Sequence, residues 1–235
     1  KNLTCWVITE GMIGTQNQCV GVAEALGVLP IIKTVSLRQP WKTLTPWLGF
    51  ECARTFIEPL NTPWPDLLIA SGRKAVAASR YIKKQSGGKT FTVQIQDPKC
   101  AASFFDLVAV PHHDKLRGEN VIVTHGAPNR LTTEKLSNAK AQFAPLFAPL
   151  PSPRIAVLIG GNSRTHTITP TIMHNLVSQL KSLNGSLMVT ASRRTGEENL
   201  EILKAGLKGT NAYIWDNKGD NPYHGMLAYA DHILV

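Results

Sequence analysis

Short apolar segments alternate with segments of helical periodicity along most of the chain. Apolar runs of strand length occur at residues 3–8, 30–37, 66–71, 91–96, 106–111 and 120–124, and again at 154–159, 187–191, 212–215 and 232–235. Helices are predicted at residues 16–26, 73–85, 133–143, 170–183, 197–207 and 226–230. Strands that alternate with helices imply a parallel sheet. The pattern therefore predicts an α/β protein.

The pattern divides into two halves. The apolar, proline-rich run APLFAPLPSP at residues 144–153 is typical of an interdomain linker, and we predict domains at 1–146 and 152–235. Each half is expected to be a doubly wound, Rossmann-like parallel sheet with polar or glycine-rich loops at the carboxyl ends of its strands, where such sheets bind ligands. Two such domains facing a cleft have the layout of GT-B glycosyltransferases, in which the C-terminal domain holds a nucleotide-sugar donor and the N-terminal domain holds the acceptor.

The second domain is expected to be incomplete. The chain stops on the apolar segment 232–235, and nothing after it would cover a strand of a parallel sheet. We therefore expect the natural protein to continue past Val235.

Residues 38–65 break the alternation. The segment is rich in proline and holds the aromatic residues Trp41, Trp47, Phe50, Phe56 and Trp64 beside the basic residues Arg38, Lys42 and Arg54. It is either an amphipathic element that lies on a membrane surface or an irregular insertion that packs on its own domain.

Composition restricts the class of protein and of partner. A content of 43% hydrophobic and 17% charged residues is typical of a globular protein and excludes a disordered one. The net charge of +9 favours anionic partners, and because the Lys and Arg residues are scattered, it favours a nucleotide or an anionic membrane surface over nucleic acid. The four cysteines form no C-x-x-C pair, which indicates free thiols in a reducing compartment. We expect a cytoplasmic protein, with peripheral attachment to a membrane left open.

A glycine-rich turn after the strand 154–159 predicts a phosphate site. Bare backbone at Gly160, Gly161 and Asn162 can approach a pyrophosphate, and a helix follows with Thr169 as its N-cap. Ser163 and Arg164 would add a hydroxyl group and a charge. The next strand exit holds Ser192, Arg193, Arg194 and Thr195, which could reach the same anion or face solvent, and Asn221 and Tyr223 could close around the base or ribose.

The first half holds the candidates for a general base, which are Glu10, His112, His113 and Asp114. Alternation along an extended segment would place His112 and Asp114 on one side, as a base and the group that orients it. The chain contains no D-x-D sequence and no third ligand beside these histidines, so we expect no metal and no cofactor, with a nucleotide sugar as substrate.

A short glycine motif follows the first predicted strand. Gly11 and Gly14 have the spacing G-x-x-G, whereas a dinucleotide-binding turn has G-x-G-x-x-G, and NAD binding is therefore not expected. Gly11, Gly14, Asn17 and Gln18 would line the acceptor side of the cleft, or they simply form a tight turn.

The residues closely resemble a known family over nearly the whole chain. The motifs that carry the resemblance are TEGMIGTQNQCVGVAEALG, PDLLIASGRKA, QIQDPK, FDLVAVPHHDKLRGENVIVTHGAPNR, VLIGGNSRTH, VTASRRTGEE and NPYHGMLAYADHILV. The chain resembles the mitochondrial-fission "elongated mitochondria" family and its bacterial homologues, which are often labelled glycosyltransferases. In that family the chain runs on into an acidic and serine-containing segment that belongs to the donor site.

The resemblance implies two classes of function. One is an enzyme that transfers a sugar from a nucleotide donor to an acceptor at a membrane. The other is a non-catalytic adaptor, because plant members of the family recruit a dynamin-related protein to mitochondria. An older label for the family is nucleoside-diphosphate-sugar epimerase. A short-chain epimerase is excluded, because no tyrosine has a lysine four residues later and the glycine-rich NAD-binding turn is lacking.

Overall fold

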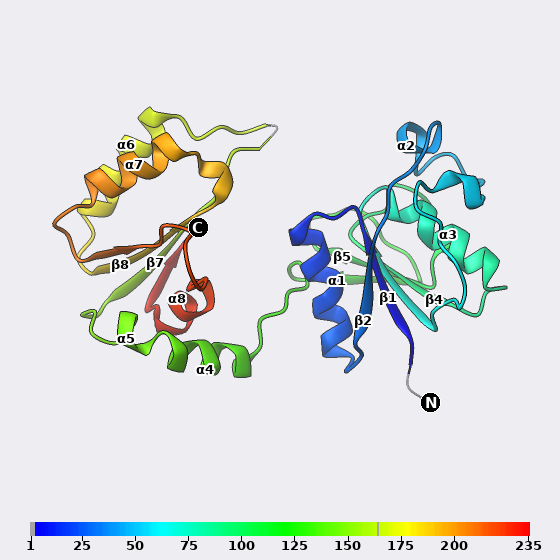
Figure 1. Cartoon of the computed structure of the whole chain (residues 1–235), viewed down its shortest axis with the longest axis horizontal. Helices are drawn as coiled ribbons and strands as arrows, with labels where there is room; N and C mark the ends of the chain where they lie inside the picture. Colours follow the sequence, from blue (N-terminus) through cyan, green and yellow to red (C-terminus); the bar gives the residue numbers. More distant parts are fainter. Residues whose placement is uncertain (1–2, 164) are drawn as a thin grey trace. The chain divides into compact units, whose positions relative to one another are not determined.

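The computed structural model describes residues 3–163 and 165–235, except for the side chain of Arg193. The chain forms two compact units, Lys1–Arg130 and Leu131–Val235. Each unit contains one parallel sheet with helices, and the sequence prediction of an α/β fold with two parallel sheets is confirmed (Figure 1). No helix in the described part of the chain has the length and apolar character needed to span a bilayer.

The first unit is built on a six-stranded parallel sheet in the order β2-β1-β3-β4-β5-β6. Its strands are β1 (Cys5–Thr9), β2 (Pro30–Thr34), β3 (Leu67–Ser71), β4 (Phe91–Ile95), β5 (Leu107–Pro111) and β6 (Val121–Thr124). Its helices are α1 (Ile13–Ala25), α2 (Trp41–Leu44) and α3 (Ala75–Gln85), with short 3₁₀ turns η1 (Ala53–Thr55) and η2 (Ala102–Phe104).

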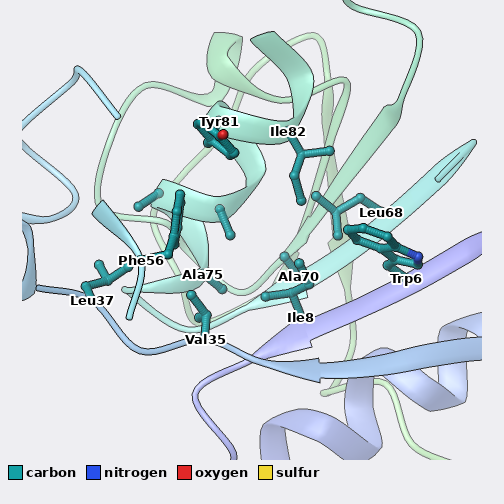
Figure 2. Close-up of a cluster of buried hydrophobic side chains, with 12 residues drawn as sticks. Trp6, Ile8, Val35, Leu37, Phe56, Leu68, Ala70, Ala75, Tyr81 and Ile82 are labelled. Atoms are coloured by element: carbon teal, nitrogen blue, oxygen red, sulfur yellow. The ribbon is translucent and has the colours of Figure 1, made fainter. Parts of the chain in front are cut away.

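Alternating side chains of β1 fill two cores, one on each face of this sheet. Cys5 and Val7 pack with buried residues of α1, whereas Trp6 and Ile8 point to the opposite face. Figure 2 shows that second core, in which Trp6 and Ile8 lie with Tyr81 and other residues of α3. Because both faces are covered, the strands consist of nearly continuous apolar residues, which is why the sequence revealed them.

The second unit is built on a four-stranded parallel sheet in the order β10-β7-β8-β9. Its strands are β7 (Arg154–Ile159), β8 (Ser186–Ala191), β9 (Ala212–Ile214) and β10 (His232–Leu234), and its helices are α4 (Thr133–Gln142), α5 (Ala144–Phe147), α6 (Pro170–Lys181), α7 (Glu197–Gly206) and α8 (Tyr223–Tyr229), with the 3₁₀ turn η3 (Arg193–Thr195). The predicted N-cap of α6 is confirmed, since the Thr169 hydroxyl accepts a hydrogen bond from the Ile172 N–H.

Helices cover both faces of the second sheet, and those on one face come from the two ends of the unit. On one face Ile155 and Val157 of β7 pack with buried residues of α6 and α7. On the other face Ala156 of β7 and Met188 of β8 pack with residues of α4, α5 and α8. The helix α4 therefore belongs to the second unit, although it precedes the first strand of that unit in the chain.

The prediction of a linker at residues 144–153 is wrong for its first part, which is helical. Residues 144–147 form α5, and Phe147 is fully buried beneath the second sheet, where its ring makes an edge contact with Tyr213 at 5.2 Å between centroids. The division between the units lies at Arg130, earlier than the domain boundary predicted at residue 146. The reason is physical: the apolar residues of this run were attributed to a linker, but together with α4 and α8 they cover one face of the second sheet.

Replacing Phe147 by Ala should destabilise the second unit by about 3–5 kcal/mol, because the substitution removes buried contacts and leaves a cavity. The matched control is Leu146→Ala, whose side chain is exposed and whose loss should cost no more than about 0.5 kcal/mol. Urea unfolding followed by near-UV circular dichroism measures both. Equal midpoints for the two variants would contradict a structural role for α5.

Candidate functional site

The order of strands in the second sheet defines where a ligand can bind. The chain adds β8 and β9 on one side of β7 and then returns to place β10 on the other side, so the direction of winding reverses between β7 and β10. Ligands of open α/β sheets bind beyond the carboxyl ends of the strands at such a reversal. A cavity of about 420 Å³ occupies this end of the sheet, and it is lined by Leu158, Ile159, Gly160, Thr190, Ala191, Ser192, Trp215, Asn217, Asn221, Tyr223 and Val235.

The structure brings part of the predicted donor set together in this cavity, which we call the second-unit pocket. Gly160 and Ser192 come from the exits of β7 and β8, while Asn221 and Tyr223 come from the start of α8. The Asn221 side chain accepts a hydrogen bond from the Tyr223 N–H at 3.0 Å, which fixes the backbone before α8.

The loops that follow β7 and β8 are bonded to each other. The Asn162 N–H donates to the Arg194 carbonyl oxygen at 3.0 Å, and the Thr195 hydroxyl donates to the Gly160 carbonyl oxygen at 2.8 Å. Their backbones are so close that a Cβ atom on Gly161 would lie 2.5 Å from the Cβ atom of Arg194. Glycine is required at position 161 because any side chain would separate the loops.

These bonds change the expected roles of several residues. The Asn162 N–H and the Thr195 hydroxyl are already used between the loops, and the Ser163 hydroxyl accepts hydrogen bonds from the N–H groups of Thr165 and His166. These groups therefore shape the loops. The Arg194 side chain is exposed, whereas Arg164 and the side chain of Arg193 lie outside the described residues.

Sequence reasoning missed three residues of this region. Trp215 and Asn217 line the second-unit pocket after β9, and the Trp215 indole N–H donates to the Lys218 carbonyl oxygen. Asn199 of α7 is buried and donates to the carbonyl oxygens of Ile168 and Thr195, which holds both loops against the helix. The rule applied to the exits of β7 and β8 also applies to β9 and would have identified Trp215.

Gly161→Ala should destabilise the protein by about 1–3 kcal/mol, because the new methyl group forces the two bonded loops apart. The control is Gly160→Ala, where a Cβ atom would meet nothing within 4 Å and the free energy of unfolding should change little. Thermal unfolding of both variants tests this difference. If Gly161→Ala unfolds with the wild-type midpoint, the close contact between the loops is not present.

In the first unit the winding reverses between β1 and β3, and Glu10 lies at that point. One oxygen of its carboxylate accepts the Lys74 backbone N–H at 2.9 Å, and the other pairs with Lys74 Nζ at 2.9 Å. Gly72, with φ of +97°, brings the backbone against the carboxylate. Burial alone would raise the pKa of Glu10, but the hydrogen bonds from Lys74 and the charges of Lys74 and Arg73 lower it.

Glu10→Gln should cost about 1 kcal/mol of stability at neutral pH, because it removes the ion pair with Lys74 and weakens the bond to the start of α3. The pKa of Glu10 is lowered on folding, so its stabilising effect is present above the pKa of the unfolded chain, about 4.3, and is lost as the pH falls through the folded pKa. Unfolding midpoints measured from pH 7 down to about pH 3 should converge for the two proteins. A constant difference over that range would exclude this ionised carboxylate as the cause.

A second cavity, of about 350 Å³, lies in the first unit at the exits of β4 and β5. We call it the first-unit pocket, and it is lined by Gln18, Ile95, Gln96, Asp97, Lys99, Ala109, Pro111, His113, Asp114, Ala127 and Pro128. Gln96 and Lys99 have positive φ angles of 71° and 58°, which non-glycine residues adopt at a cost of about 1 kcal/mol or more. Such backbone strain is concentrated at functional sites.

Two contacts fix the polar wall of the first-unit pocket. The Gln96 side-chain amide donates to Gln18 Oε1 at 3.0 Å, and Lys99 Nζ donates to Asp97 Oδ2 at 2.7 Å. Burial would raise the pKa of Asp97, but the hydrogen bonds and charge of Lys99 lower it. The pocket thus presents an ionised carboxylate and an ammonium group beside an apolar floor.

The predicted pairing of His112 with Asp114 is wrong. It required an extended segment, whereas β5 ends at Pro111 and the chain turns, with the Asp114 N–H donating to the Pro111 carbonyl oxygen at 2.9 Å. Of His112, His113 and Asp114, the residues that line the first-unit pocket are His113 and Asp114. Gln18 lies in the same pocket, while Gly11, Gly14, Asn17 and Glu10 are not among its lining residues.

Within residues 3–163 and 165–235, no three His, Cys, Asp or Glu side chains gather as a metal-binding group. The first-unit pocket offers carboxylate, imidazole and ammonium groups. The second-unit pocket offers backbone at a glycine together with aromatic and amide side chains.

Nearly the whole chain is similar in sequence to known proteins. A family model described as "Mitochondrial fission ELM1" matches residues 13–235. The chain is 24% identical to mitochondrial fission protein ELM1 of Arabidopsis thaliana, in an alignment that covers 97% of this chain and 73% of the relative. It is 23% identical to the uncharacterized protein RP120 of Rickettsia prowazekii, with coverage of 99% and 77%.

Two solved structures share the fold. MurG of Acinetobacter baumannii matches with a TM-score of 0.51 at 12% identity, over 98% of this chain and 70% of that one. The UDP-GlcNAc 2-epimerase of Methanocaldococcus jannaschii matches with a TM-score of 0.52 at 12% identity, over 98% of this chain and 78% of that one. The fold is therefore GT-B-like, as the sequence predicted.

Proposed function

The chain belongs to the mitochondrial fission ELM1 family, and on that premise we propose that it is a GT-B-type glycosyltransferase, which transfers a sugar from a nucleotide-diphosphate donor to an acceptor without a metal. The observation that supports this most is the second-unit pocket, which lies at the reversal of its sheet and beside the glycine-rich loop after β7, which is bonded to the loop after β8. Backbone at such a place suits an anionic diphosphate.

The donor is assigned to the second unit. The diphosphate would lie against the backbone at Gly160 and the hydroxyl of Ser192. Arg193 and Arg194, which follow Ser192 in the sequence, are the candidates to supply positive charge. The base and ribose would occupy the part of the pocket formed by Trp215, Asn221 and Tyr223. An aromatic ring and an amide are the groups that stack on a base and donate to its edge.

The acceptor is assigned to the first-unit pocket. Its hydroxyl oxygen would form a bond to the anomeric carbon of the sugar, while the bond from that carbon to the diphosphate oxygen breaks and the nucleoside diphosphate leaves. The hydroxyl proton would pass to His113 or Asp114, which line the pocket. Glu10 is a positioning residue in this proposal, because both of its carboxylate oxygens are bonded to Lys74 and its lowered pKa makes it a weak base.

The charge of the chain supports partners of the same kind. A net charge of +9 attracts a nucleotide diphosphate and also an anionic membrane surface, at which a lipid-borne acceptor would be found. The family name supports a second candidate, a non-catalytic adaptor that binds a protein partner at such a surface. Binding of a nucleotide separates the two.

Titration of the full chain with UDP, GDP, ADP, CDP and their sugar conjugates, by calorimetry and thermal shift, tests the proposal. One nucleoside diphosphate should bind and raise the unfolding midpoint. Asn221→Ala and Tyr223→Ala should each weaken that binding about tenfold, equal to about 1.4 kcal/mol, because both side chains line the pocket.

Asn184→Ala provides the matched control. This exposed asparagine precedes β8, at the opposite edge of the sheet, and its loss should leave the affinity unchanged. An Arg193→Ala/Arg194→Ala double variant should weaken diphosphate binding further. Failure of every nucleotide to bind to a folded chain would reject the enzyme and favour the adaptor.

A further inference from the structure

Residues 41–51 form an irregular segment that displays large aromatic side chains to solvent, and we call it the aromatic loop. It begins with α2, which lies at the periphery of the first unit, after the carboxyl end of β2 (Figure 1). Trp47 is 72% exposed and Phe50 is 71% exposed. Two aromatic side chains that face water within four residues are costly to solvate, and they indicate a surface that is covered in some functional state.

Two arginines of the α3 region hold the backbone of this loop. Arg73 donates to the carbonyl oxygens of Lys42, Thr43 and Thr45, at 3.2, 3.0 and 2.7 Å. Arg80 donates to the carbonyl oxygens of Pro46 and Leu48, each at 2.8 Å.

A third side chain also contributes a donor, because the Trp41 indole N–H bonds to the Phe50 carbonyl oxygen at 2.8 Å. The carbonyl of Leu44, between these positions, accepts the N–H groups of Trp47 and Leu48. Carbonyl groups of an irregular surface loop are ordinarily satisfied by water. Here the protein supplies donors to the carbonyl oxygens of residues 42–46, 48 and 50, which lowers the cost of moving this part of the loop out of water, since each unpaired polar group would carry a penalty of several kcal/mol.

The exposed charged residues within positions 38–57 are basic. Glu51 is the only acidic residue between positions 38 and 57, and its side chain is 4% exposed and paired with Arg80, whereas the next acidic residue, Glu58, is exposed. The basic residues Arg38, Lys42 and Arg54 are exposed in the same stretch. Exposed basic residues in the same stretch as exposed aromatic rings match the surface of a bilayer that contains anionic lipids.

We propose that the aromatic loop is a membrane-docking surface, which inserts Trp47 and Phe50 into the interface of a bilayer while Arg38, Lys42 and Arg54 contact anionic headgroups. The aromatic rings supply apolar burial at the headgroup level, and the arginine-bonded backbone keeps the loop rigid as water is displaced. This surface deepens the proposed function, since it places the unit that holds the acceptor pocket at a lipid surface. Its test needs no nucleotide, so it fails or succeeds separately from sugar transfer.

Co-sedimentation of the full chain with vesicles tests the proposal. The protein should bind phosphatidylcholine vesicles that contain about 30% phosphatidylserine more strongly than vesicles of phosphatidylcholine alone, and added salt should weaken binding. Trp47→Ala/Phe50→Ala should reduce the bound fraction at least about tenfold, because it removes the inserted apolar surface. Lys42→Glu/Arg54→Glu should abolish the preference for phosphatidylserine.

Leu26→Ala/Leu29→Ala is the matched control, because these two side chains are also exposed in the first unit but lie between α1 and β2. This variant should bind vesicles like the wild type, and circular dichroism should show all the variants folded. Wild-type protein that stays in the supernatant with both kinds of vesicle would overturn the proposal. Equal binding by the Trp47→Ala/Phe50→Ala variant and the wild type would also overturn it.

Discussion

In both units the parallel sheet carries apolar side chains on each of its faces, and helices must remove both faces from water. This requirement determines how the chain is divided. In the second unit, α6 and α7 cover one face, and the other face is covered by α8 together with α4 and α5, which precede the sheet in sequence. Phe147 is fully buried as a result, and a run that looks like a linker becomes part of a core.

The strands and most helices could be predicted because their signals are local. Each of these signals occupies a few adjacent positions, as in the apolar runs of β1 and β7 and the Thr169 cap. Such a run is compatible with few other secondary structures. The site was predicted less well because its contacts join distant residues. Nothing near Glu10 in sequence indicates its bond to Lys74, and nothing near Asn162 indicates its bond to Arg194. The turn after Pro111 likewise places His113, and not His112, with Asp114 in the first-unit pocket.

The fold limits the chemistry without selecting it. A MurG protein and a UDP-GlcNAc 2-epimerase both share this architecture at 12% identity, so the architecture alone does not distinguish transfer from epimerisation. The missing Y-x-x-x-K sequence excludes only the short-chain class of epimerase, which has a different fold. The residues of the two pockets and the charge of the chain, rather than the fold, therefore support the proposal of sugar transfer.

The carboxylate of Glu10 makes the two sheet reversals differ in whether an external anion can bind there. The start of a helix at a sheet reversal attracts a negative ligand, and both units have such a place. In the first unit the chain fills that place with its own anion, and a diphosphate arriving there would be repelled. A resident carboxylate of this kind lets the first sheet keep the geometry of a sheet reversal while it disfavours an external anion there.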